Sequence, residues 1–288
     1  MNEGTALVQS GRPRAGAAAL REAVRIDSDN RDAWLNLGAN HYNAGRYLDA
    51  RRAFARAAEG KGAASPAEVA HAMALALVAL AAEAQDKAAA DELIHEALSW
   101  LEGEAGSLAA AQLLAGTLHE DLGATTAADR AYRRAIKLGP TDARAYARLG
   151  GLYADNGFFA EAVEVLRTGT RLSSRPAVVW MAMGRAQAMT DELPDAVEAY
   201  RKALAVELEP AETADATFGL GMALAELGEI DEAVGLLERY LRIEPEARAA
   251  HLRAAEWRLA QLHLQQLERT PPPPSPAPSP ADDATGRR

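Results

Sequence analysis

Small and large apolar residues return at a fixed spacing along most of this chain. In a 34-residue frame that starts at Arg31, a small residue falls at positions 8, 15 and 20 and a large one at position 24; these are Gly38, Gly45, Ala50 and Phe54. The pattern starts again at Ala109, Ala143, Ala177 and Ala214. No stretch shows the strict alternation of polar and apolar residues that marks a strand. The pattern therefore predicts consecutive pairs of helices joined by short turns.

The residue types at these positions suit closely packed helix pairs. Two helices approach to about 8–10 Å when their crossing carries small side chains, which positions 8, 20 and 27 supply. The large residue at position 24 is expected to fill the space between neighbouring repeats. The glycine at position 15 predicts a left-handed backbone where each first helix ends, at Gly45, Gly123, Gly157 and Gly228.

Two stretches depart from the frame. Residues 71–104 keep the small residues of the second helix, but Val78 and Gln85 replace the two glycines, so a degenerate repeat with longer loops is expected. Residues 1–30 match only the later part of the frame, which indicates a truncated N-terminal repeat. The predicted organisation is a repeat array over 31–247, with repeats near 31–64, 71–104, 109–142, 143–176, 177–210 and 214–247, then a capping helix over 248–269 and a disordered proline-rich tail over 270–288.

The frame resembles the tetratricopeptide repeat, whose pattern is W-x2-L-G-x2-Y followed by A-x3-F and a closing proline. The residues that carry the resemblance in the first complete copy are Trp34, Leu37, Gly38, Ala50 and Phe54. The resemblance, which extends to bacterial tetratricopeptide adaptors, implies an all-α fold. The expected architecture is a right-handed α-solenoid, a superhelix of helix-turn-helix repeats.

Composition narrows the classes of partner. The chain has 288 residues, no cysteine and a net charge of -10, with 31 Lys and Arg against 41 Asp and Glu. Binding to nucleic acid or to anionic lipid is disfavoured, because it requires many cations to neutralise phosphates. The most apolar window, Val69 to Ala82, is shorter than the roughly 18 residues of a membrane span. No signal peptide is visible, so the cytoplasm is the default location, with the periplasm or envelope if an upstream signal is missing.

No arrangement of residues typical of catalysis is present. None of the six histidines forms the i, i+4 pair of a helical zinc site, and the consecutive residues His119, Glu120 and Asp121 would point in different directions on a helix. No phosphate-binding loop, nucleophile elbow or kinase signature occurs, and Gly219 and Gly221 lie within an expected helix rather than after a strand. The sequence predicts neither an enzyme nor a catalytic, cofactor-binding or metal-binding site.

In the tetratricopeptide family, the first helix of each repeat lines a concave groove that binds an extended peptide or a helix. The resemblance implies that this groove includes Leu113, Leu114, Arg144, Arg148, Met181, Arg185, Phe218 and Met222. The two arginines of the frame from Ala143 match one part of the carboxylate clamp found in chaperone adaptors. Leu75, Ala79 and Leu114 stand where the other parts need Lys and Asn, so that clamp is incomplete.

The resulting hypothesis is a non-catalytic scaffold or adaptor that holds a peptide or amphipathic helix of a partner protein. Two alternatives remain: a regulatory or substrate-recruiting module of an enzyme complex whose catalytic domain lies elsewhere, and a self-associating array. The last expected helix carries two apolar stripes. Leu252, Ala255, Leu259 and Leu262 would cover the last repeat, whereas Trp257, Leu264 and Leu267 could form a homodimer.

Overall fold

The computed structural model describes residues 13–243 and 249–269 of the chain. The chain divides into two compact units, Met1–Met189 and Thr190–Arg288. The division between the units falls inside the frame that starts at Ala177, between its two helices. The start of the expected N-terminal repeat and the whole proline-rich tail lie outside the described residues.

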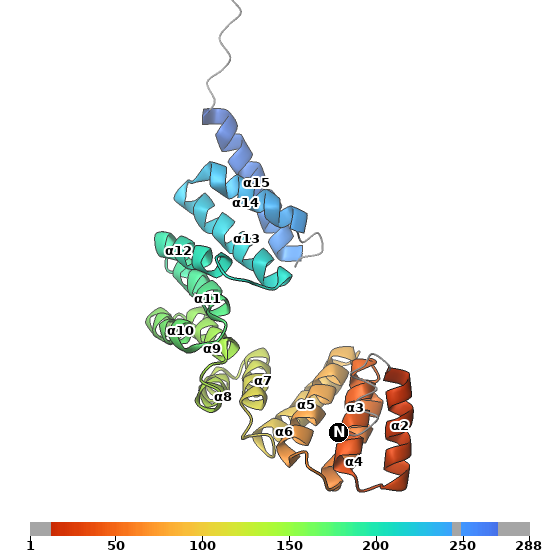
Figure 1. Ribbon diagram of the computed structural model, residues 1–288. Helices are drawn as coiled ribbons and strands as arrows, with labels where there is room; N and C mark the ends of the chain where they lie inside the picture. The colour runs from red at the N-terminus through yellow and green to blue at the C-terminus, as the bar shows by residue number, and fades with distance from the viewer. Residues whose placement is uncertain (1–12, 244–248, 270–288) are drawn as a thin grey trace, which may run out of the picture. The chain divides into compact units, whose positions relative to one another are not determined.

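Each unit is a series of helices in which successive members pack side by side (Figure 1). The first unit contains α2 (Pro13–Ile26), α3 (Arg31–Asn43), α4 (Tyr47–Glu59), α5 (Pro66–Glu83), α6 (Lys87–Glu102), α7 (Ala109–Asp121), α8 (Thr125–Leu138), α9 (Ala143–Asp155), α10 (Phe159–Leu172) and α11 (Pro176–Met189). The second contains α12 (Leu193–Leu204), α13 (Pro210–Leu227), α14 (Ile230–Ile243) and α15 (Ala249–Arg269). Among the described residues there is no strand, only an isolated bridge between Asn30 and Lys61. The predicted all-α repeat architecture is confirmed.

The glycine at position 8 sets the distance between the two helices of a repeat. A Cβ atom added to Gly38, Gly116 or Gly150 would lie 2.4 Å from a side-chain atom of the residue 16 positions later, and one added to Gly221 would lie 3.0 Å from Leu237. That later residue occupies position 24. Position 24 therefore packs against the glycine of its own repeat. Phe54 and Tyr132 also cluster with residues of the following repeat, as expected for a residue that fills the space between repeats.

Four of the turns between paired helices have the left-handed backbone that the sequence predicts. Gly45, Gly123, Gly157 and Gly228 have φ angles between 72° and 80°. In the frame from Ala177 the same position is occupied by Asp191, which has a φ of 62° and is the one non-glycine residue with positive φ in the described chain. A side chain in this conformation is strained by contact between Cβ and the backbone.

Replacing Asp191 with glycine is expected to raise the free energy of unfolding by about 0.5–1 kcal/mol, because the strain outweighs the extra freedom of glycine in the unfolded chain. Urea denaturation followed by circular dichroism measures the change. Glu192, the next residue, has a φ of -80° and is the matched control. Glu192→Gly should lower stability, and a loss at both positions would contradict the assignment of strain to Asp191.

The degenerate repeat is held in place by a longer loop before α5. The guanidinium of Arg31 donates hydrogen bonds to the carbonyl oxygens of Ala57, Gly60 and Ala64 at 3.3, 2.8 and 3.1 Å. Asp32 accepts the backbone N–H groups of Ala63 and Ala64, and these bonds lower the pKa of its carboxyl group. The loop thus gains defined contacts that replace those of a short turn.

Helix α5 is the one described helix that is long and apolar enough, by composition alone, to cross a membrane. Its apolar residues are also core residues: Val69, Met73 and Leu77 are 3% exposed or less. Met73 and Leu77 belong to a cluster that also includes Leu101 and Leu118 from neighbouring helices. The hydropathy of α5 is therefore accounted for by its central place in the first unit.

The last helix, α15, packs against α13 and α14 with one face. Ala255 and Leu262 on this face are fully buried, and Leu252 and Leu259 are half-buried. The opposite stripe is open: Trp257, Leu264 and Leu267 are 63%, 62% and 71% exposed. One apolar face of α15 therefore completes the second unit, while the other has no cover from the residues that the structure describes.

Candidate functional site

The first helices of three successive repeats form a continuous row in the first unit. Helix α9 packs against α7 on one side and against α11 on the other. Six of the eight residues expected in the groove lie on these helices: Leu113, Leu114, Arg144, Arg148, Met181 and Arg185. The structure thus brings these six onto neighbouring elements, and the row α7, α9 and α11 is the candidate site of this unit.

The apolar members of the row are half-buried. Leu113 packs against a cluster that contains Tyr132, Leu149 and Leu152, so part of its side chain belongs to the core. Leu114 contacts the larger cluster around α5. Met181, on α11, is also of intermediate exposure. These side chains offer partial apolar surfaces set between helices.

The three arginines of the row have different surroundings. Arg144 is tied to its own helix start, since its guanidinium donates to Asp142 at 2.9 and 3.1 Å. This contact lowers the pKa of the Asp142 carboxyl group. Arg185 reaches from α11 to α9 and pairs with Asp155 at 2.6 Å. Arg148 is exposed and has no ion pair with any residue in the described chain, so it is the arginine of the row most available to an external acid.

Two tyrosines, the buried Tyr132 and the half-buried Tyr153, link α8 to α7 and α9 of this row through acidic residues. The hydroxyl group of Tyr132 donates to Glu120 at 2.7 Å, and burial raises the pKa of that hydroxyl group far above its usual value. Tyr153 donates to Asp129 and accepts from Arg133, and burial followed by the bond to Asp129 raises its pKa to about 12. Both hydroxyl groups therefore stay protonated at neutral pH and act as structural donors.

In the second unit, the expected groove residues Phe218 and Met222 lie on α13. The ring of Phe218 stacks on His251 of α15 at 4.7 Å between centroids and lies 5.2 Å from Tyr240 of α14. Phe218 therefore takes part in the packing between α13 and the last helix. Met222 is half-buried on the same helix.

The histidines of the repeats make structural contacts. His41 accepts a hydrogen bond from Arg46 at 3.0 Å, and burial together with this arginine lowers the pKa of its ring. His119 contacts the Glu102 carboxylate at 2.7 Å, whereas its neighbour Glu120 turns toward Tyr132. In the described part of the chain, no three His, Cys, Asp or Glu residues gather in a geometry that could hold a metal ion.

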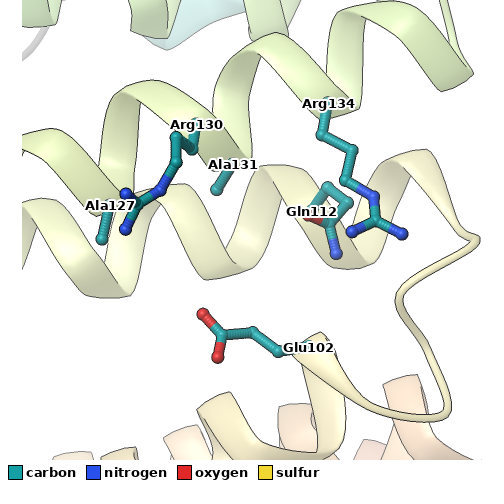
Figure 2. Close-up of a pocket in the computed structure, with 6 residues that line it drawn as sticks. All are labelled: Glu102, Gln112, Ala127, Arg130, Ala131 and Arg134. Atoms are coloured by element: carbon teal, nitrogen blue, oxygen red, sulfur yellow. The ribbon is translucent and has the colours of Figure 1, made fainter.

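A cavity of about 220 Å³ opens where α6 ends against α7 and α8. Figure 2 shows Arg130 and Arg134 on α8 at one side, Glu102 facing them from α6, and Gln112 of α7 beside Arg134. Ala127 and Ala131 complete the lining. The side chain of Gln112 is buried and donates a long hydrogen bond of 3.4 Å to the carbonyl oxygen of Leu101.

A protein-family model described as tetratricopeptide repeat matches residues 1–66, 113–175 and 181–248, which is more than half of the chain. The chain belongs to the tetratricopeptide-repeat family. No curated protein sequence shows a significant match. Helical repeats of this family act as protein interaction modules, so the coarse role of this tetratricopeptide protein is to bind other proteins.

Solved structures support the same fold. A tetratricopeptide repeat protein from Parabacteroides merdae superimposes with a TM-score of 0.61 at 15% identity, covering 91% of this chain and 96% of that one. The crystal structure of the APC/C hetero-tetramer Cut9-Hcn1 gives the same TM-score at 17% identity and covers 89% of this chain. This chain spans about half of that protein, 47% of its length. At these identities the likeness shows the fold alone.

The cavity beside α8 was not expected from the sequence. Its signal is present at position 4 of the frame, where the tetratricopeptide pattern has tryptophan. Trp34, Tyr146 and Trp180 occupy this position in three repeats, whereas the repeats from His71, Ala109 and Ala214 have Ala74, Gln112 and Thr217. The smaller side chain and the longer connection over residues 103–108 together leave the space that becomes the cavity.

Proposed function

We propose that this protein is a non-catalytic scaffold that binds an extended or helical segment of a partner protein along the row α7, α9 and α11. The observation that carries the proposal is the adjacency of these first helices, which sets half-buried apolar side chains beside exposed arginines. Leu113 and Met181 would contact apolar residues of the segment. Met181 suits this role because an unbranched thioether adapts to different surfaces.

Arg148 would provide the main electrostatic contact, because no acid of the described chain neutralises it. Arg185 contributes only if the partner's acid competes with Asp155, whose pair with Arg185 has a separation of 2.6 Å. Arg144 is held by Asp142 at the start of its helix. The preferred ligand is therefore a segment with an acidic residue flanked by apolar ones. Phe218 and Met222 would belong to a separate surface of the second unit.

The variant Arg148→Glu with Met181→Glu is expected to lose partner capture, since truncating an anchor at a desolvated hot spot costs about 2 kcal/mol or more. Partners identified by affinity purification and mass spectrometry with the parent protein supply the ligand for a direct binding measurement. The control is Arg167→Glu with Leu172→Glu, which makes similar changes on the second helix α10, where Leu172 is 51% exposed. Equal binding by both double variants would rule out this row as the site.

A second function, self-association through α15, is favoured by the exposed stripe of Trp257, Leu264 and Leu267. These residues and Ala260 recur at spacings of three and four, which is the seam of a two-helix coiled coil. Exposed Arg253 and Glu268 flank the stripe at opposite ends. In an antiparallel pair the arginine of one copy would lie beside the glutamate of the other, so the stripe is complementary to a second copy of itself.

A further inference from the structure

The cavity between α6, α7 and α8 lies beside Gln112, which stands where three other repeats have an aromatic residue at position 4. Trp34 and Tyr146 at this position each donate a hydrogen bond to a carbonyl oxygen six residues earlier, those of Ser28 and Pro140. Gln112 keeps an equivalent bond, to Leu101, but has no ring to fill the space beyond it. At about 220 Å³, the cavity is smaller than the roughly 300–1,000 Å³ of most small-molecule sites, so it suits a single side chain.

Two uncompensated cations line this cavity. Arg130 and Arg134 are one helical turn apart on α8, both are exposed, and neither has an ion pair with any described residue. Arg133, the third arginine of the helix, pairs with Asp129 at 3.0 Å. Like charges four residues apart repel each other on a helix. An anion bound between the two guanidinium groups would relieve this repulsion and accept their hydrogen bonds.

The opposite wall limits which anion fits. Glu102 faces the arginines from α6, and its carboxylate is held by His119 at 2.7 Å. This negative charge disfavours a dianion such as phosphate more than it disfavours a carboxylate. Ala127 and Ala131 give the wall of α8 a small apolar surface, which matches the methylene groups of a glutamate or aspartate side chain.

We infer that this cavity binds the carboxylate of an acidic side chain from a partner protein, with Arg130 and Arg134 as its ligands. The inference deepens the proposed function and rests on it for the protein nature of the partner. It adds a contact formed by the second helix α8 and the end of α6, apart from the first-helix residues of the row. A partner that bound the cavity and the row together would need one acidic residue for the cavity in addition to the segment held by Arg148.

The experiment uses a defined probe, an acetylated and amidated peptide in which four glutamates alternate with glycines. The matched peptide has glutamine in place of each glutamate. Each peptide is titrated into arginine-labelled protein, and NMR follows the guanidinium N–H groups. The acidic peptide should shift the signals of Arg130 and Arg134, and the glutamine peptide should not. Tighter binding of inorganic phosphate than of this peptide would overturn the assignment to a carboxylate.

Variants test the site itself. Arg130→Gln with Arg134→Gln should lower the affinity for the acidic peptide by about tenfold, which corresponds to the loss of one or two charge-assisted hydrogen bonds. The same change on α10, Arg167→Gln with Arg171→Gln, should leave its affinity unchanged. Gln112→Trp should fill the cavity and abolish binding while circular dichroism shows an intact fold. Glu102→Gln should strengthen binding severalfold; weaker binding would contradict the placement of the ligand.

These variants also separate the cavity from the row of first helices. In the variant Arg148→Glu with Met181→Glu, the signals of Arg130 and Arg134 should still shift with the acidic peptide. If only this variant loses the peptide, the carboxylate binds on the row, so the cavity inference fails and the proposed function remains. If the cavity variants lose the peptide while the row variant still captures the partner, the cavity inference stands and the proposed function of the row fails.

Discussion

Replacing Gly150 with leucine is expected to lower the free energy of unfolding by about 1–3 kcal/mol, the cost of overpacking a close helix crossing. A Cβ atom at this position would lie 2.4 Å from Cγ of Leu166 and within 2.8 Å of both its methyl carbons. Because Leu166 is fully buried, it has no room to move away. Thermal and urea unfolding followed by circular dichroism measure the effect.

The neighbouring glycine is a matched control for this prediction. A Cβ atom at Gly151 would meet only the guanidinium of Arg185, at 3.8 Å. Gly151→Ala should therefore raise stability by about 0.5–1 kcal/mol, because alanine loses less backbone freedom than glycine in a helix. Adding Leu166→Ala to Gly150→Leu should recover part of the loss. Similar effects of substitution at the two glycines would mean that the close crossing is not at Gly150.

The double variant Trp257→Glu with Leu264→Glu is expected to convert a self-associating protein into a monomer. Burying a large apolar side chain fully contributes about 1.5–3 kcal/mol, and a carboxylate placed in the same interface would be left without a partner. Light scattering should give the parent twice the 30.5 kDa monomer mass at high concentration. The variant should stay at the monomer mass, with unchanged helicity.

Two further measurements make this prediction specific. Leu138→Glu with Leu172→Glu changes residues that are 42% and 51% exposed at other helix ends, and it should leave the mass of the parent unchanged. Because the chain has no cysteine, Ala260→Cys introduces a single thiol at the middle of the stripe. In an antiparallel pair residue 260 of one copy faces residue 264 of the other, so Ala260→Cys mixed with Leu264→Cys should form a disulfide-linked heterodimer. A parent that is monomeric at every concentration would exclude the dimer.

The sequence by itself determined the local geometry of the repeats. A left-handed turn needs a residue without Cβ strain, so the recurring glycines Gly45, Gly123, Gly157 and Gly228 are enough to locate four of the turns. The contact between position 8 and position 24 joins two helices connected by one short turn, so it recurs at a fixed separation along the chain. Such features depend on neighbouring residues and on repetition, and both are visible in a sequence.

Only the tertiary structure decided which side chains meet across different repeats. The pair of Arg185 with Asp155, the stacking of Phe218 on His251 and the cavity beside Arg130 each depend on the facing residue of another helix. The 34-residue frame places a residue on a helix face, but it does not say what covers that face. The packing of neighbouring helices sets that cover, and this is why Arg148 is exposed while Phe218 is half-buried against Tyr240 and His251.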